Sequence, residues 1–270
     1  MYGYGNSMFL ATHGILAKSG GGGGIDPDAQ AFITAAGITG PTQQTAVNQL
    51  VLDLKSYSLW TKMNAIYPIV GGTSSSHAVN LKSPGTYNLS FATGWTHAST
   101  GMTPNGATYA STGLNVNTVM SLNSMAIGVY SRTNSAGSAS GHGAGAGGAN
   151  ACFIIERWTD NVSYVQVNTT TNTSLAVTNS SGFYQASRTA SNAMRLVRNT
   201  THATSTAAST AKPNLYFLFG ARSTDLSNSA IQYSSREIAF GYLGDGLTQT
   251  ECNNYYTAVQ AFQTTLSRQV

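Results

Sequence analysis

The sequence predicts a mainly β protein, an antiparallel sandwich or barrel that follows two helices and is closed by a third. Many short runs of β-branched and aromatic residues, separated by Gly, Ser, Asn and Thr, extend from about residue 74 to residue 243. Apolar residues at helical spacing precede and follow these runs. With 270 residues, the chain is long enough to bury a full core.

Residues 1–24 form a separate piece of sequence. The apolar stretch MYGYGNSMFLATHGILA precedes a run of glycines over residues 20–24, which have no side chains to pack. We expect a docking arm and its tether, with the arm buried against another chain by strand addition or insertion into a groove. The alternative is a disordered tail. The expected docking residues are Tyr2, Tyr4, Met8, Phe9, Leu10, Ile15 and Leu16.

The same stretch lacks a basic region before its apolar residues, contains His13 and is too short to span a bilayer. We therefore expect no signal peptide, no membrane insertion and synthesis in a cytoplasm.

Residues 25–72 are expected to form a helical lead-in. Asp26 and Pro27 supply an N-cap and a first-turn proline, and Gly37 suits the end of that helix. Pro41 opens a second helix, because apolar residues follow it at i, i+3, i+4 and i+7. Its expected apolar face is Val47, Leu50, Val51, Leu54 and Tyr57.

Residues 73–270 are expected to form the β domain with a C-terminal helix. The Gly-rich stretch over residues 135–149 contains no Gly-Lys-Ser/Thr, so we expect a long surface loop and no phosphate-binding loop. The segments with strand character are HAVNLK, YNLSF, MAIGVYSR, ACFIIERW, SYVQV, SLAV, FYQASR, NLYFLFGA and REIAFGYLG.

A last helix begins at a capping box formed by Thr248 and Glu251. Its apolar residues recur on one face, so this helix is expected to cover a sheet. That face consists of Cys252, Tyr255, Tyr256, Val259, Phe262 and Leu266.

Charged residues make up only 8% of the chain, and the 13 basic residues are scattered. Only Arg188, Arg195 and Arg198 come close together, and no aromatic residues are interleaved with them in the manner of a single-strand-binding site. We interpret them as a solvated face and expect no nucleic-acid partner. Cys152 and Cys252 both have the pattern of small buried residues, and a single disulfide between them stays open.

The sequence offers few groups for catalysis or metal binding. Glu156 and Asp160 share a strand face but lie roughly 13 Å apart, farther than the two carboxylates of a glycosidase. Glu237, beside Arg236, suits a structural ion pair, and Asp245 suits a turn. No GxSxG motif is present.

The pairs Asp160–Asn161 and Asp225–Asn228 supply too few oxygens for the six to eight ligands of Ca²⁺. We expect no catalytic residues, no metal and no cofactor.

The stretch GWTHASTGMTPNG offers a candidate sugar site. Trp95 and His97 point to the same face of a strand, and Asn105 and Tyr109 follow closely. An aromatic face with uncharged polar neighbours is typical of sugar recognition. Alternation with Phe91, however, puts Trp95 on the core side of the strand, so we favour packing of Trp95 in the core, behind a surface turn over residues 99–106.

The closing segment REIAFGYLGDGLTQTECNNYYTAVQAFQTTLSRQV resembles the concanavalin A-like lectin/glucanase superfamily, which includes laminin-G-like domains. Together with AFITAAGITGPTQQTAVNQLVLDLKSYSLWTKMNAIYPIVGGTSSSHAVNLK, GWTHASTGMTPNGATYAST, YSRTN and RTASN, it is similar to a bacteriophage virion protein family that joins such a sandwich to a helical lead-in. The resemblance covers residues 26–270, although Gly40 stands where an acidic cap usually precedes the proline. It implies an antiparallel jelly-roll β-sandwich displayed on a virus particle, and it implies no particular ligand.

The function expected from the resemblance is that of a non-enzymatic virion structural protein, tail- or fibre-associated or capsid-decorating. Its arm would bind other virion proteins, its sandwich would contact a host-surface glycan, and the protein would form a homo-oligomer. The alternatives are a carbohydrate-binding lectin in the strict sense and a polysaccharide depolymerase.

Overall fold

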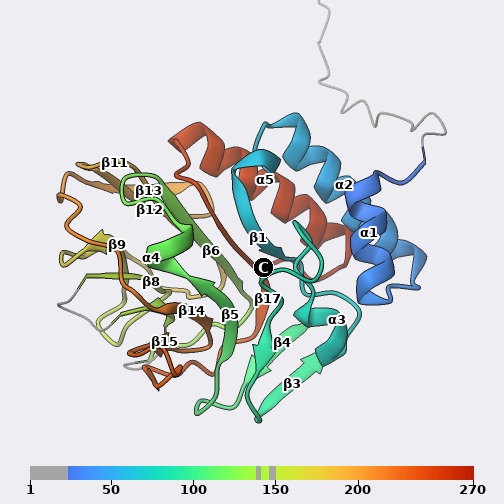
Figure 1. Cartoon of the computed structure of the whole chain (residues 1–270), viewed down its shortest axis with the longest axis horizontal. Coiled ribbons are helices and arrows are strands. Elements are labelled where there is room, and N and C mark those ends of the chain that lie inside the picture. The colour runs from blue at the N-terminus through green and yellow to red at the C-terminus, as the bar shows by residue number, and fades with distance from the viewer. Residues whose placement is uncertain (1–23, 138–140, 146–149) are drawn as a thin grey trace, which may run out of the picture.

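The computed structural model describes residues 24–137, 141–145 and 150–270. The expected docking arm, with its candidate residues between Tyr2 and Leu16, lies outside the described residues. Within them, two sheets pack face to face, and helices cover the outer face of one sheet (Figure 1). The expected β-sandwich with a helical lead-in and a C-terminal helix is confirmed.

Sheet A, as far as the chain is described, has eight strands in the order β13-β12-β11-β6-β17-β4-β3, with β1 also paired to β17. All of its pairs are antiparallel. Its strands are β1 (Met63–Tyr67), β3 (Trp95–Ala98), β4 (Gly101–Pro104), β6 (Met125–Ser131), β11 (Gly182–Ala190), β12 (Ala193–Arg198), β13 (Thr201–Ser205) and β17 (Ile238–Gly244).

Sheet B has nine strands in the described ranges, with the central order β10-β9-β8-β7-β14-β5-β2. The short strand β15 pairs in parallel with β7, whereas the other pairs are antiparallel. Its strands are β2 (Ser90–Phe91), β5 (Ala110–Asn115), β7 (His142–Ala144), β8 (Ala151–Ile155), β9 (Val162–Thr169), β10 (Thr173–Ala176), β14 (Tyr216–Phe219), β15 (Arg222–Ser223) and β16 (Ala230–Ile231).

Local capping chemistry sets the bounds of the first long helix. In α1 (Pro27–Ala36), the Asp26 carboxylate accepts a hydrogen bond from the Asp28 amide, and Gly37 ends the helix in the left-handed region at φ 63°. The helix α2 (Pro41–Ser56) starts at its proline, although Gly40 supplies no side-chain cap.

The C-terminal helix α5 (Gln249–Thr265) starts at the expected capping box, in which Thr248 and Glu251 bond each other's main-chain amides. The shorter helical segments are α3 (Ser74–Ala78), α4 (Val116–Val119) and the single 3-10 turn η1 (Trp60–Lys62). No helix in residues 24–137, 141–145 or 150–270 has the length and apolar character needed to cross a membrane.

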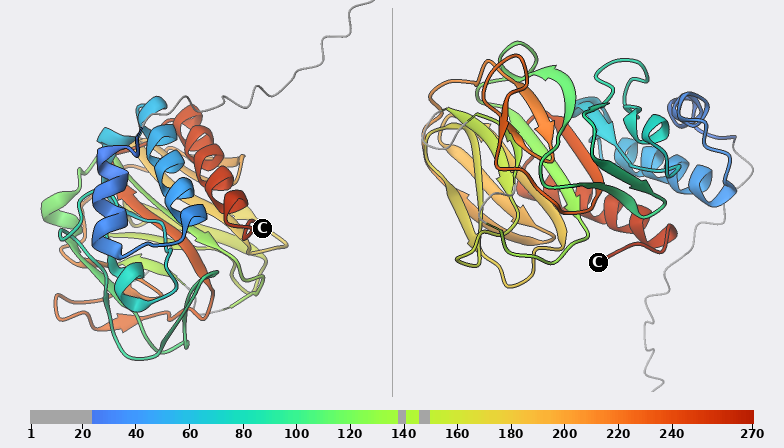
Figure 2. Two further views of the ribbon diagram at one scale, coloured as in Figure 1. Left: turned by 90° about the vertical axis from the view of Figure 1, so that its right-hand side faces the viewer. Right: turned by 90° about the horizontal axis from the view of Figure 1, so that it is seen from below.

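The core is divided into layers. Helices α1, α2 and α5 lie side by side (Figure 2) and bury their apolar faces on sheet A, against residues such as Tyr130, Phe183 and Tyr242. A second cluster fills the space between the sheets, where Ile127 and Ile154 are buried. The outer face of sheet B carries only a small cluster around Phe153. The two inner faces of the sheets cover each other, and the helices cover the outer face of sheet A. The outer face of sheet B is therefore the face that the described elements leave open.

Several expectations about the strands and helices were wrong. HAVNLK lies partly in α3, because Thr73 and Ser76 cap a helical turn there. Residues 99–106 are not one surface turn: β4 pairs with β3, and the turn is confined to residues 99–100. The Gly-rich stretch contains β7, which is buried between neighbouring strands. In α2, Tyr57 caps the helix end and is exposed.

Arg188 also differs from the expectation of a solvated face. Its side chain is fully buried, and its guanidinium donates to the main-chain carbonyls of Val167, Ser191 and Ala207. With so few carboxylates in the chain, carbonyl oxygens serve as the acceptors that a buried guanidinium needs.

Candidate functional site

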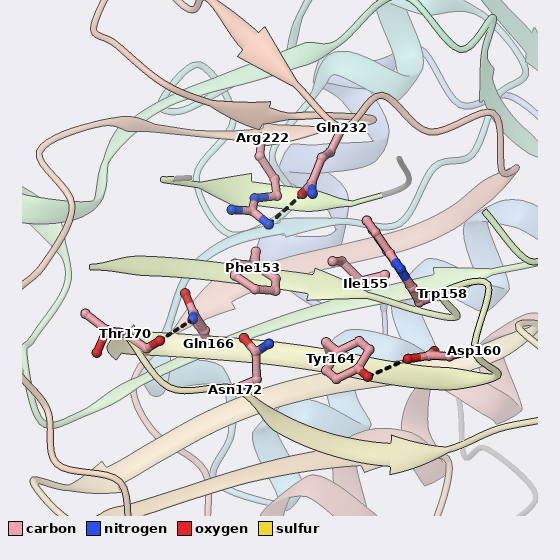
Figure 3. Close-up of a pocket in the computed structure, with 10 residues that line it drawn as sticks. All are labelled: Phe153, Ile155, Trp158, Asp160, Tyr164, Gln166, Thr170, Asn172, Arg222 and Gln232. Atoms are coloured by element: carbon pink, nitrogen blue, oxygen red, sulfur yellow. Dashed lines mark hydrogen bonds between the residues drawn. The ribbon is translucent and has the colours of Figure 1, made fainter. Parts of the chain in front are cut away.

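The uncovered outer face of sheet B carries a shallow groove of about 350 Å³ (Figure 3). Side chains alternate across a strand, and this alternation places its lining residues. On β8, Cys152 and Ile154 face the inter-sheet core, whereas Phe153 faces outward. The lining consists of Phe153, Ile155, Trp158, Asp160, Tyr164, Gln166, Thr170, Asn172, Arg222 and Gln232.

Aromatic rings form one part of the groove. Trp158 lies in the turn after β8, where its main chain exchanges hydrogen bonds with residues 161 and 162. Tyr164 follows on β9 and donates its hydroxyl hydrogen to the Asp160 carboxylate at 2.7 Å. This hydrogen bond fixes the direction of the phenol and raises the pKa of Tyr164. The two rings are half-buried and stay accessible to a ligand.

Amide groups form the next part. Gln166 is 2% exposed, and its amide nitrogen donates to the Thr170 carbonyl at 2.9 Å. Its Oε1 atom has no hydrogen-bond partner among the described residues. A buried acceptor without a partner costs free energy. This oxygen is shielded from solvent, so a ligand hydrogen-bond donor reaches it only when the Gln166 side chain turns into the groove that it lines. Asn172 lies beside it and is exposed.

The guanidinium of Arg222 lies over the Phe153 ring, 3.9 Å from the ring centroid. Arg222 is 1% exposed; its Nε and Nη2 atoms donate to the Gly145 carbonyl, and its Nη1 atom donates to Gln232 at 2.6 Å. It makes no ion pair with a carboxylate of the described residues. Burial lowers the pKa of Arg222 to about 10.

Gly143 on β7 and Gly141 just before that strand make room for this arrangement. A Cβ atom on Gly143 would lie 2.3 Å from the Cys152 carbonyl oxygen, so no side chain fits there. A Cβ on Gly141 would lie 3.1 Å from the Arg222 side chain. Because Gly143, which pairs with Arg222 across β7 and β15, carries no side chain on the outer face, Arg222 can reach across β7 to Phe153.

The groove is equipped for binding. It combines aromatic faces with amide, hydroxyl and guanidinium groups, as sites for polar ring-shaped ligands do. Asp160 is the one carboxylate that lines it. A glycosidase of the usual two-carboxylate type needs a second one close by. The nearest in sequence, Glu156, is fully buried and bonded to His142 and Arg236.

The binding residues expected from the sequence lie elsewhere, around the β3–β4 hairpin of sheet A. Trp95 packs 5.5 Å from Phe91, ring centroid to ring centroid, and its indole nitrogen is buried without a partner in the described part of the chain. The Asn105 side chain accepts from the Ala107 amide. Tyr109 precedes β5, and its carbonyl accepts from the Ala92 amide. Ligand binding by these residues stays a prediction.

His97 makes a specific contact in this hairpin. Its Nδ1 atom lies 3.0 Å from Nδ1 of the buried His77, and His77 Nε2 accepts from the Gly72 amide. His77 must therefore carry its proton on Nδ1 and donate it to His97. Burial, the neighbouring His97 and Arg268 lower the pKa of His77 to about 3, and burial lowers the pKa of His97. Both rings are neutral at pH 7.

The other candidates from the sequence have structural contacts. Glu237 pairs with Arg132 at 2.9 Å and not with its neighbour Arg236. The described ranges contain no group of three or more His, Cys, Asp or Glu residues that could hold a metal ion. Cys152 and Cys252 are free and buried, and burial raises the pKa of each thiol to about 12.

Sequence reasoning missed the groove, although part of its signal was present. The alternation of Phe153, Ile155, Tyr164 and Gln166 with inward-facing residues is visible in the strand segments. The sequence pattern does not show which sheet face the helices leave open.

Comparison with known protein families and with curated proteins finds no match. Among solved structures, domain 4 of an extracellular GH43 arabinanase from Geobacillus stearothermophilus, solved with arabinotriose, has a TM-score of 0.46 at 14% identity, over 72% of this chain and 98% of that one. The binding domain of botulinum neurotoxin serotype D gives 0.48 at 11%, over 74% and 52%. A Trypanosoma rangeli sialidase gives 0.47 at 9%, over 79% and 39%. The chain thus spans about half the length, or less, of the toxin and sialidase chains. The fold of the described residues is that of a β-sandwich with one helix-covered and one open outer face.

Proposed function

We propose that the protein is a non-enzymatic glycan-binding display module, which holds a saccharide in the groove on the outer face of sheet B. The observation that carries the proposal is the combination of the accessible rings of Trp158 and Tyr164 with the Gln166 Oε1 atom, which has no hydrogen-bond partner among the described residues. A sugar ring offers an apolar face that stacks on an aromatic side chain and hydroxyls that both donate and accept. The groove supplies partners for both.

The chemistry of the groove favours binding over hydrolysis. The groove presents Asp160 as its lining carboxylate, and that group already accepts hydrogen bonds from Tyr164 and from the Val162 amide. The raised pKa of Tyr164 opposes a phenolate at neutral pH. Neither group has the environment that prepares an acid or a nucleophile for glycoside cleavage.

Replacing Trp158 by alanine is expected to weaken glycan binding about ten- to a hundredfold, because it removes one of the two accessible rings of the groove. Trp158 lies in a turn and is half-buried, so the variant should keep its fold. The measurement is binding to a glycan array followed by titration calorimetry with the best ligand.

Trp95→Ala is the matched control, because it removes the same side chain from the β3 hairpin of the other sheet. The folded fraction of that variant should bind as the wild type does. Binding that survives Trp158→Ala and disappears with Trp95→Ala would place the site at the hairpin.

We also propose that the module is displayed on a bacteriophage particle, with residues 1–19 as its anchor. Support for this comes from the sequence resemblance over residues 26–270 and from the apolar, nearly uncharged arm. Deletion of residues 1–19 should leave the fold intact and remove the protein from purified particles. Normal incorporation of the truncated protein would contradict an anchoring role for the arm.

A further inference from the structure

The groove contains a buried positive charge that the fold does not neutralise. Arg222 lies at one end, stacked on Phe153, and no carboxylate of the described residues lies within ion-pair distance. Burying an unpaired charge is costly in free energy. The stacked ring and the Gly145 carbonyl offset part of that cost, since both interact favourably with a cation.

The guanidinium also retains hydrogen-bonding capacity. It has five N–H groups, and its contacts with Gly145 and Gln232 use one on each nitrogen. Nη1 and Nη2 each keep one N–H without a partner in the described ranges. Donors in the plane of a guanidinium match the two oxygens of a carboxylate.

The charges of the groove are arranged along its length. In Figure 3, Arg222 and Gln166 lie on either side of Phe153, whereas Trp158, Tyr164 and Asp160 gather at the other end. A negative group is therefore attracted at the Arg222 end and repelled at the Asp160 end. This polarity disfavours a uniformly charged polyanion and favours a ligand with one acidic group.

We propose that the groove selects an acidic saccharide, with the carboxylate of one residue at Arg222 and a neighbouring ring on the aromatic residues. This inference rests on the proposed glycan-binding function and adds the ligand class. Gln232, which is half-buried and covers Nη1, is the side chain that must yield or share the guanidinium when the carboxylate binds.

The test uses paired glycans that differ in their carboxylates: oligogalacturonate beside its carboxyl-reduced form, and sialyllactose beside lactose. At least one acidic member should bind about ten- to a hundredfold more tightly than its neutral counterpart, because a hydrogen-bonded charge pair is lost. The preference should shrink as salt is raised from about 0.05 to 0.5 M, because salt screens the accessible part of the attraction.

Arg222→Gln should abolish the preference for acidic over neutral glycans, while the neutral glycans still bind. Arg195→Gln, on β12 of the other sheet, is the control and should preserve that preference. The glycan pairs measure the same preference on the wild-type protein, so a variant that fails to fold leaves the test intact. Neutral glycans that bind equally well, with binding lost in Trp158→Ala, would overturn the acidic assignment and leave the proposed function standing. Absence of binding to every glycan would overturn both.

Discussion

Replacing Glu156 by glutamine is expected to lower the free energy of unfolding by about 3–5 kcal/mol, because it breaks a buried ion pair and leaves one charge behind. Glu156 and Arg236 are fully buried, with 3.2 Å between Oε2 and Nη1. His142 Nδ1 accepts from the Gly220 amide, so its Nε2 carries the proton that Glu156 Oε1 accepts at 2.9 Å. A glutamine side chain has one acceptor oxygen, so it can accept a hydrogen bond from His142 or from Arg236, but it cannot replace both carboxylate oxygens.

The network of Glu156, His142 and Arg236 connects the two sheets, so its loss should destabilise the whole fold. His142 lies on β7 and Glu156 directly follows β8, both in sheet B, whereas Arg236 precedes β17 of sheet A. Arg236 also donates to the carbonyls of Ser135 and Arg157. Its charge therefore stays fixed between the layers when the carboxylate is removed.

Glu156 should also account for part of the loss of stability that the fold undergoes in acid. Burial alone would raise the pKa of Glu156, but His142 and Arg236 outweigh it and lower the pKa from 4.5 to about 2. A carboxyl group with a depressed folded pKa stabilises the fold above its unfolded pKa, and that stabilisation disappears as the pH falls from about 4.5 to 2. Glu156→Gln should lose this part of the acid dependence.

Urea unfolding of the wild type and variant at pH 7 and at several lower pH values measures both effects. Glu237→Gln is the matched control, because its pair with Arg132 is partly exposed and should contribute about 1 kcal/mol or less. Equal losses in the two variants would show that burial does not set the strength of the Glu156 pair. The double replacement Glu156→Leu with Arg236→Met should cost less than Glu156→Gln alone.

Replacing Phe183 by alanine is expected to lower the free energy of unfolding by about 3–5 kcal/mol, because it opens a cavity in the centre of the apolar cluster between the helices and sheet A. Phe183 is fully buried on β11, and its ring centroid lies 5.9 Å from that of Tyr255 on α5 and 6.0 Å from that of Phe240 on β17. The Tyr242 and Tyr255 rings, stacked at 4.3 Å, hold the surrounding positions and limit collapse into the gap.

Chemical denaturation again gives the loss, and Phe91→Ala is the control, since Phe91 is half-buried on the short strand β2. The Phe183 variant should lose clearly more stability than the Phe91 variant. Similar losses would contradict the view that α5 is joined to sheet A chiefly through this aromatic cluster.

The helix termini could be predicted from the sequence because their chemistry is local. Asp26 with Pro27, Gly37, and Thr248 with Glu251 each act on main-chain groups within a few residues. The strand β7 could not be predicted in this way. It lies in a Gly-rich stretch, and only pairing with β8, β14 and β15 makes it a strand. A pattern of small residues carries no periodic signal for such tertiary pairing.

The candidate site shows the same contrast between local signals, which the sequence reveals, and tertiary placement, which it does not. Trp95 and His97 stood out because a tryptophan and a histidine at strand spacing suggest a ligand, yet the fold uses His97 to bond His77. Arg222 carried no local signal, because its position depends on the glycines of a neighbouring strand and on the Phe153 ring of the next. The open face of sheet B depends on where the helices pack, which is a property of the whole fold.

The most direct test of the central claim is hydrogen–deuterium exchange of the wild-type protein with and without a saturating glycan chosen from the array. We predict slower exchange over residues 151–172 and 222–232, which line the groove on the outer face of sheet B. Protection confined to residues 95–109, the β3–β4 hairpin and the segment that leads into β5, would contradict this account and return the site to the candidate residues named from the sequence.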